Sequence, residues 1–140
     1  MPKSGPIIIV EDDNDDQELL KEVFEDLRIP NQFIFFNTGH QVLAYLLITT
    51  DKPLIIISDI NLPLMTGLQL RHEINENDFL RRKSIPFIFL TTNSDKKTIQ
   101  HAYEMMVQGY FVKPSNIREI KEMMKMIIDY WKICKHPNSE

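Results

Sequence analysis

The stretch Leu54-Ile55-Ile56-Ile57-Ser58-Asp59 places a carboxylate directly after an uninterrupted apolar run. Such a run, without polar alternation, is typical of a strand that is covered on both faces of a parallel sheet. A second apolar run, from Ile7 to Val10, also ends in acids, at Glu11 and Asp12. Because burying a carboxylate is costly unless it is paired or bound to a metal, acids at two strand ends indicate a cation site.

Five short apolar runs alternate along the chain with five longer segments of helical period. The strands are predicted at 7–10, 32–36, 54–58, 87–90 and 110–112, and the helices at 15–27, after Gly39, from Gly67, around 99–106 and at 116–135. Parallel strands need crossover connections, and helices are the usual crossovers. The alternation therefore predicts an α/β fold, in which five helices cover a doubly wound parallel sheet of five strands.

The composition is that of one globular domain. With 140 residues, of which 43% are hydrophobic, we expect a single domain over 1–140 with a core at about 6–134 and no output domain. A formal net charge of -4 argues against a nucleic-acid binder, which needs a basic face. A single cysteine, Cys134, excludes an intramolecular disulfide, and no apolar stretch approaches the roughly 20 residues of a membrane span. We therefore expect a cytoplasmic protein that contacts neither DNA nor membrane directly.

The strand ends are predicted to share one edge of the sheet. Thr91 and Lys113 each follow an apolar run, as Asp59 and the acids at 11–12 do. Ligands of open doubly wound sheets bind at this edge. Carboxylates for a metal, a hydroxyl and an ammonium are the groups that phosphoryl transfer to a carboxylate requires. Each residue taken singly also fits an ordinary strand end or turn, so the prediction depends on the whole set.

The acidic run at 11–16 has more than one interpretation. A solvated loop that caps a helix accounts for most of its members, namely Asp13, Asp15 and Asp16. An EF-hand is excluded, because a loop counted from Asp12 has Gln17 at the required glycine position. Counting from Glu11 puts Asp16 there instead. The remaining interpretation is a Mg²⁺ site whose ligands are Asp12, the acid after the third strand and a turn carbonyl.

Four motifs in combination resemble the response-regulator receiver domain of two-component signalling. They are Val-Glu-Asp-Asp at 10–13, Ser-Asp-Ile-Asn-Leu-Pro at 58–63 with Gly67, Leu-Thr-Thr at 90–92 and Tyr-Phe-Val-Lys-Pro at 110–114. The resemblance covers the chain from Ile7 to about Ile133. It implies a flavodoxin-like sheet with the strand order 2-1-3-4-5.

The resemblance also implies a phosphoacceptor and a metal site. Asp59 would accept a phosphoryl group from a sensor histidine kinase or a phosphotransfer protein. Mg²⁺ would be held by Asp12, Asp59 and the backbone carbonyl of Asn61, with Glu11 as a further acid that binds directly or through water. The chain would catalyse only its own phosphorylation and dephosphorylation, and it would therefore not be an enzyme with a separate substrate.

Three further residues match the residues that respond to phosphorylation in receivers. Thr91 would hydrogen-bond a phosphoryl oxygen in the active state, and Lys113 would pair with its charge. Tyr110 matches the switch aromatic that turns inward when Thr91 moves. Receivers usually hold the bond before the matching proline in the cis form, which makes Lys113-Pro114 a candidate for that isomer.

Three segments of the sequence resemble one subfamily of receivers more than the others. An extended turn at 79–86, the run 91–94 and the ending at 129–131 look like the stand-alone receivers paired with bacterial phytochromes. Thr92 is bulkier than the alanine often found there and is expected to narrow access to the phosphoryl group. Asn61 and Asn93 flank the pocket where receivers vary most, so the sequence does not predict how long a phosphoryl group would stay bound.

The last helix carries two apolar stripes. The stripe expected to face the core consists of Ile117, Ile120, Met124, Ile127, Trp131 and Cys134, and the stripe beside it of Met123, Met126, Tyr130 and Ile133. A broad buried arc is one explanation for the second stripe, and a binding surface is the other. In receivers the face made by the fourth helix, fifth strand and fifth helix commonly serves dimerisation or partner binding.

Two other functions fit the same pattern less well. Haloacid-dehalogenase-type phosphohydrolases need a second acid two residues after the nucleophile on the first strand, whereas Asn61 has that place here, on the third. A flavodoxin-like cofactor module needs a phosphate-binding loop after the first strand, where Glu11 and Asp12 would repel a phosphate. The receiver remains the leading hypothesis.

Overall fold

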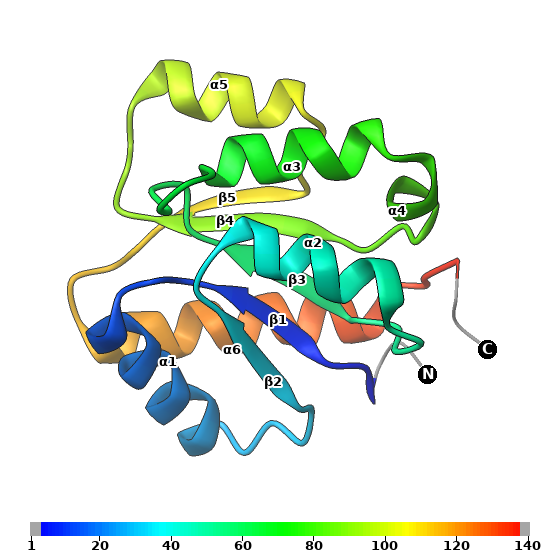
Figure 1. Cartoon of the computed structure of the whole chain (residues 1–140). Helices are drawn as coiled ribbons and strands as arrows, with labels where there is room; N and C mark the ends of the chain where they lie inside the picture. The colour runs from blue at the N-terminus through cyan, green and yellow to red at the C-terminus, as the bar shows by residue number, and fades with distance from the viewer. Residues whose placement is uncertain (1–3, 138–140) are drawn as a thin grey trace.

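The computed structural model describes residues 4–137 and contains one sheet of five parallel strands (Figure 1). The strand order is β2-β1-β3-β4-β5, which confirms the predicted order. Each predicted strand is present, and its ends differ from the prediction by no more than one residue. The strands are β1 (Ile7–Val10), β2 (Phe33–Phe36), β3 (Ile55–Ser58), β4 (Phe87–Thr91) and β5 (Gly109–Val112).

The described residues form six helices, whereas five were predicted; the first five lie between strands and the last follows β5. They are α1 (Asn14–Asp26), α2 (Gly39–Ile48), α3 (Gly67–Glu76), α4 (Asp78–Arg82), α5 (Lys96–Glu104) and α6 (Ile117–Ile133). The additional helix is α4, most of which lies in the segment predicted as an extended turn. Asn77 explains the break, because its extended backbone (φ -101°, ψ 112°) ends α3. Its side chain then accepts a hydrogen bond from the N–H of Leu80 and caps α4.

The sheet lies between two layers of helices. In Figure 1, α1 and α6 cover one face, and α2, α3 and α5 cover the other. Successive side chains of a strand point to opposite faces. Ile7 and Ile9 therefore join the core formed with α1 and α6, whereas Ile8 and Val10 join the core formed with α2, α3 and α5. Two cores explain why the strands are apolar without alternation.

The last helix is buried along the middle of the predicted stripe, whereas the two ends of that stripe are more exposed than expected. Ile120, Met124 and Ile127 are buried as expected, and Ile128 is buried in addition. The prediction was wrong for Ile117, which is 37% exposed. It is exposed because it begins the helix, directly after the loop that follows β5.

The second stripe of α6 is largely exposed. Met123 packs against the core, but Met126, Tyr130 and Ile133 are exposed. Trp131 and Cys134, which were expected to face the core, are only partly buried. On α5 and just after it, Tyr103 and Met106 are also exposed, so apolar surface is present on both elements beside β5. Among the described residues, none of the helices combines the length and apolar character that a membrane span requires.

Candidate functional site

The register of the central strands brings two acids together. Val10 of β1 lies opposite Ser58 of β3, so that Glu11 and Asp59 leave the sheet side by side. The N–H of Asp59 donates to the carbonyl of Val10 at 2.9 Å, which continues the ladder beyond the strand end. The two carboxylates are therefore placed by the sheet itself and not by a flexible loop.

The next strands bring a hydroxyl and an amine to the same edge. Thr91 is the last residue of β4, is fully buried and lies opposite Val112 of β5. Lys113 follows Val112, and its N–H donates to the carbonyl of Thr91 at 2.8 Å. The structure thus brings together Glu11, Asp59 and Lys113, with the buried Thr91 at the end of the strand between β3 and β5.

The Lys113 side chain lies among three carboxylates. Its Nζ donates to Glu11 Oε1 at 2.7 Å and to Asp16 Oδ2 at 3.0 Å. It lies 3.6 Å from Asp59 Oδ2. Burial lowers the pKa of the Lys113 amine, but the hydrogen bond with Glu11 and the charge of Asp59 outweigh burial, and the net pKa lies above its ordinary value. The ammonium form is therefore firmly held at this edge.

Glu11 is the most deeply buried acid of the site. Its side chain is 3% exposed, and its Oε2 accepts a hydrogen bond from the N–H of Asp13 at 3.2 Å. Burial raises the pKa of Glu11, although its hydrogen bond and charge interaction with Lys113 act in the opposite direction. The net pKa of Glu11 lies above its ordinary value, because burial outweighs the interactions with Lys113.

Asp59 has one oxygen fixed by the backbone and one turned toward Lys113. Its Oδ1 accepts hydrogen bonds from the N–H groups of Ile60 at 2.7 Å and Asn61 at 3.4 Å. The chain passes so close behind it that a Cβ on Gly67 would lie 2.2 Å from the carbonyl oxygen of Asp59. Only glycine fits at this approach, which explains the Gly67 of the sequence motif.

Thr91 and Tyr110 contact the same residue. The Oγ1 of Thr91 accepts a hydrogen bond from the N–H of Asn93 at 3.3 Å, and the hydroxyl of Tyr110 donates to the Asn93 carbonyl at 2.7 Å. The Tyr110 ring packs edge-on against Phe89, with 6.0 Å between ring centroids. Burial, with the charges of Asp59 and Asp95, raises the pKa of the Tyr110 hydroxyl. Asn93 thus connects the two predicted switch residues.

The donors predicted for a metal are oxygen atoms at this edge. Asp12 is exposed beside Glu11, and Asn61 follows Asp59 in the β3–α3 loop. Carboxylate and carbonyl oxygens are the ligands that Mg²⁺ prefers, so the donor set fits a hard cation. No group of three or more His, Cys, Asp or Glu side chains within residues 4–137 is arranged to hold a metal ion. The positive charge beside Glu11 and Asp59 in this structure is the ammonium of Lys113.

The expectation of a cis bond at Lys113-Pro114 was wrong. No cis peptide bond occurs in the part of the chain that the structure describes. The trans form of an X–Pro bond is favoured by about 0.5–1 kcal/mol, and the hydrogen bonds of Lys113 form with the bond in that isomer.

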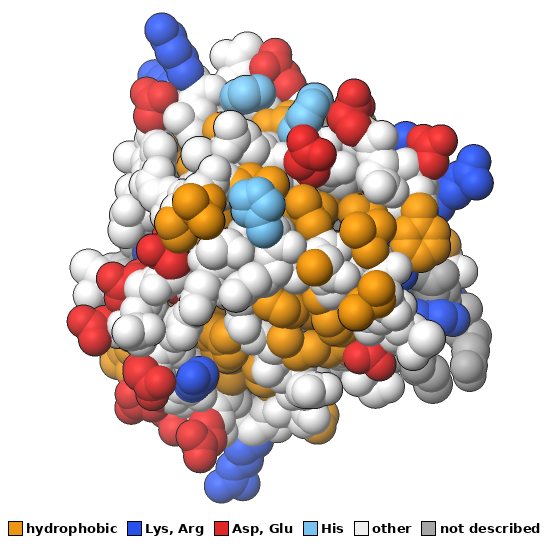
Figure 2. Space-filling model, in the orientation of Figure 1, with side chains coloured by type: hydrophobic (Ala, Val, Ile, Leu, Met, Phe, Trp, Pro, Cys, Tyr) orange, Lys and Arg blue, Asp and Glu red, His pale blue; other side chains and the backbone are white. Residues whose placement is uncertain are grey.

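Two residues of the site were not recognised in the sequence. Asp16 was interpreted as a helix-start acid, yet it binds Lys113. Gln17 donates from Nε2 to the carbonyl of Glu11 and, at 2.7 Å, to Asn37 Oδ1, which joins the loops after β1 and β2. The signal that could have identified Asp16 is the position of α1: it begins four residues after β1, so its first turn faces the site edge. Figure 2 shows acidic side chains gathered over this helix.

Comparison with known proteins agrees with this architecture. The family profile of the response regulator receiver domain matches residues 7–125. The response regulator Rcp1 of Synechocystis sp. (strain ATCC 27184 / PCC 6803 / Kazusa) is 30% identical over 130 residues, which are 89% of this chain and 87% of Rcp1.

Solved structures show the same likeness. The phosphorylated cyanobacterial phytochrome response regulator RcpA is 26% identical, with a TM-score of 0.84 over 96% of this chain and 99% of that one. The Mn²⁺-bound form of Rcp1 is 28% identical, with a TM-score of 0.82 and the same coverage. The predicted likeness to phytochrome-associated receivers is thus confirmed. The chain belongs to the response regulator receiver domain family, whose members are signalling domains of two-component systems.

Proposed function

We propose that Asp59 accepts a phosphoryl group from the phosphohistidine of a sensor histidine kinase or phosphotransfer protein. The observation that carries the proposal is the placement of Asp59 Oδ2 within 3.6 Å of Lys113 Nζ, beside the strand that ends in the buried Thr91. A nucleophilic carboxylate, an ammonium and a hydroxyl then surround the place where the phosphoryl oxygens would gather charge. Support also comes from RcpA, a relative whose crystal structure is of the phosphorylated form.

The transfer itself is a displacement at phosphorus. A carboxylate oxygen of Asp59 forms the new P–O bond while the P–N bond to the donor imidazole breaks. The imidazole keeps the electron pair and takes up a proton. Lys113 pairs with a phosphoryl oxygen as charge develops, and the hydroxyl of Thr91 donates a hydrogen bond to another. Hydrolysis by water reverses the modification and restores the Asp59 carboxylate.

A divalent cation is part of the proposal. Asp12, Asp59 and the Asn61 carbonyl would hold Mg²⁺, with Glu11 binding directly or through water. The cation would neutralise charge on the clustered carboxylates and on the incoming phosphoryl group. The donor chemistry and the Mn²⁺-bound form of Rcp1 support this assignment.

The output of the switch is proposed to be protein binding. If Thr91 moves toward the phosphoryl group, its hydrogen bond with Asn93 must change, and the hydroxyl of Tyr110 is bonded to the same residue. Tyr110 belongs to β5, which lies between α5 and α6 along the chain. Because α4 is an additional helix, the predicted fourth and fifth helices are α5 and α6 in this structure. The face formed by α5, β5 and α6 is therefore the proposed surface for dimerisation or for a downstream protein.

The decisive experiment is phosphorylation by a small donor. The protein is incubated with Mg²⁺ and acetyl phosphate, and its intact mass is measured. The wild-type protein should gain one phosphoryl group that is stable in acid and released by base, and Asp59→Asn should gain none. Asp51→Asn, which removes an exposed carboxylate from the α2–β3 loop, is the control and should be modified like the wild type. Full modification of Asp59→Asn, or rapid turnover of many phosphoesters, would contradict the proposal.

A further inference from the structure

Asp16 is an acid of the site that phosphoryl transfer does not require. It lies in the first turn of α1, and its Oδ2 accepts a hydrogen bond from Lys113 Nζ at 3.0 Å. The distance of 3.6 Å between the same Nζ and Asp59 Oδ2 is that of an ion pair but exceeds hydrogen-bonding range. The ammonium therefore gives its hydrogen bonds to Glu11 and Asp16 and not to the proposed phosphoacceptor.

The two partners of Lys113 differ in their contact with water. The Glu11 side chain is 3% exposed, whereas that of Asp16 is 40% exposed. A buried carboxylate that loses its partner cannot recover the lost hydrogen bonds from solvent, but a partly exposed one can. If Lys113 shifts toward Asp59, the contact with Asp16 is the one that breaks at low cost.

We propose that Asp16 is a positioning residue that holds Lys113 in the resting protein and competes with phosphorylated Asp59 for its ammonium group. The proposal rests on the proposed function, since it takes Asp59 as the phosphoacceptor. A phosphoryl group brings more negative charge and more acceptor oxygens than a carboxylate and draws Lys113 away from Asp16. Asp16 thus favours the resting state without touching the phosphoryl group.

The expected effect is modest, because partly exposed ion pairs are weak. Asp16→Asn should increase the affinity for beryllofluoride, a mimic of the phosphoryl group, by about threefold in the presence of Mg²⁺. The affinity is measured by isothermal titration calorimetry on the whole chain. Asp16→Glu, which restores a carboxylate, should return the affinity toward the wild-type value.

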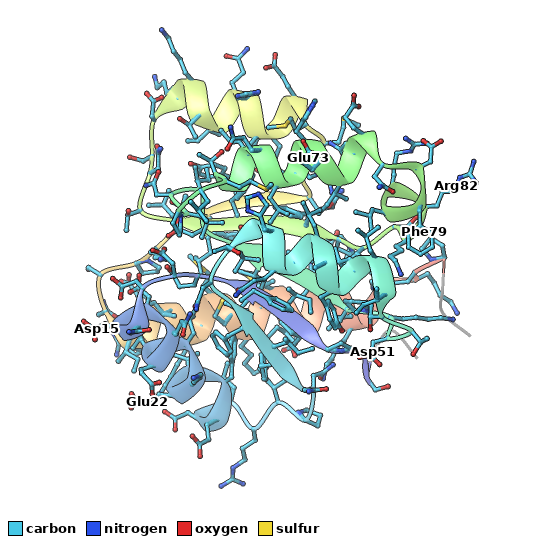
Figure 3. The ribbon with its side chains drawn as sticks, viewed as in Figure 1. Asp15, Glu22, Asp51, Glu73, Phe79 and Arg82 are labelled. Carbon is cyan, nitrogen blue, oxygen red and sulfur yellow. The ribbon has the colours of Figure 1, made fainter. Side chains whose placement is uncertain are left out.

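Asp15→Asn is the matched control. Asp15 lies one residue earlier in the same helical turn, is exposed, and forms no ion pair within the described residues (Figure 3). Its substitution removes the same charge from the same helix, so any general effect of net charge on anion binding appears in both variants. An affinity gain in Asp16→Asn that does not exceed the gain in Asp15→Asn overturns the proposal.

A second measurement reports the contact without phosphoryl chemistry. The amine resonance of Lys113 is recorded by ¹⁵N NMR and assigned by its loss in Lys113→Arg. Fast exchange with water broadens such a signal, and hydrogen bonds protect it. Asp16→Asn should broaden or shift the signal, Asp15→Asn should leave it unchanged, and Asp16→Glu should restore it. An unchanged signal in Asp16→Asn contradicts the holding contact.

The two measurements separate the possible failures. If the wild-type protein binds no beryllofluoride and is not phosphorylated, the proposed function fails and the competition fails with it, while the NMR signal still reports whether Asp16 holds Lys113. If the wild type binds beryllofluoride and the NMR signal responds as expected, but Asp16→Asn binds no more tightly than Asp15→Asn, only the competition is wrong.

Discussion

Glu11 and Lys113 form the most deeply buried ion pair in the described part of the chain, with side chains 3% and 13% exposed. Removing one partner leaves the other charge buried and unpaired. We expect Lys113→Met to lower the free energy of unfolding by about 3 kcal/mol at neutral to alkaline pH, measured by urea denaturation. Lys125→Met is the control: its pair with Asp129 is exposed, and its loss should cost only about 0.3–0.5 kcal/mol.

The cost of Lys113→Met should depend on pH. Burial raises the pKa of Glu11 in the folded protein above its ordinary value of 4.5. Protonation of Glu11 therefore stabilises the fold: this contribution is fully present below pH 4.5 and is lost as the pH rises through the folded-state pKa. Lys113 lowers this pKa, and its removal should raise it further. The difference in stability between wild type and variant should therefore shrink as the pH is lowered from neutral toward the ordinary Glu11 pKa of 4.5. An unchanged difference would mean that Glu11 is not the group left unpaired.

Gly67 is the position at which a single methyl group should disturb the site. A Cβ there would lie 2.2 Å from the backbone oxygen of Asp59 and 2.8 Å from the Phe89 ring. Backbone cannot give way as a flexible side chain can, so Gly67→Ala should lower the free energy of unfolding by about 1–3 kcal/mol in urea denaturation. Gly39→Ala is the matched control at the first position of α2, where the closest atom is Sδ of the Met65 side chain at 2.8 Å. A cost in Gly39→Ala as large as in Gly67→Ala would contradict this explanation.

Between elements, Arg71 joins α3 to the end of α5. Its Nε donates to the Met105 carbonyl at 3.1 Å and its Nη2 to the Met106 carbonyl at 2.8 Å. The guanidinium also lies 5.3 Å from the centre of the Phe87 ring. Arg71→Met should remove these charge-assisted hydrogen bonds and lower the free energy of unfolding by about 2–3 kcal/mol.

Hydrogen exchange gives Arg71→Met a local readout. Amides in the last turn of α5 should exchange faster, because the carbonyls that follow the helix lose their buried donors. Arg118→Met on α6 is the control, since Arg118 is exposed. Equal loss of stability in both variants would show that Arg71 does not hold the end of α5.

The elements differ in how well the sequence predicts them. The strands could be located closely because continuous apolar runs reflect burial on both faces. The break between α3 and α4 could not be predicted, because it depends on the backbone conformation of one residue, Asn77. The spacing of apolar residues along the sequence does not indicate such a change. The position of Asp59, Thr91 and Lys113 at one edge of the sheet could be predicted because the ends of parallel strands share an edge. The contact of Asp16 with Lys113 was missed because the two residues are distant in sequence. An acid in the first turn of a helix is also explained by its favourable interaction with the helix dipole.

Over the whole molecule, exposed apolar side chains are unevenly distributed. Several lie on or beside α5, β5 and α6, namely Tyr103, Met106, Val112, Met126, Tyr130 and Ile133. Others lie on α2 and α4, where Phe79 is exposed near the Asp51 loop (Figure 3). Only the first group adjoins the strand of Tyr110, whose hydroxyl shares Asn93 with Thr91. A change at Asp59 should therefore alter binding through the first group.

A dimer formed through the α5–β5–α6 face should respond to one charge placed on it. Tyr103 is 50% exposed on α5, and Tyr103→Glu should weaken beryllofluoride-dependent dimerisation at least about tenfold, measured by analytical ultracentrifugation, because the interface would have to bury an unpaired carboxylate. Phe79→Glu is the matched control, since Phe79 is 55% exposed on α4, outside this face. If the wild-type protein stays monomeric with and without beryllofluoride over a wide concentration range, dimerisation through this face is wrong.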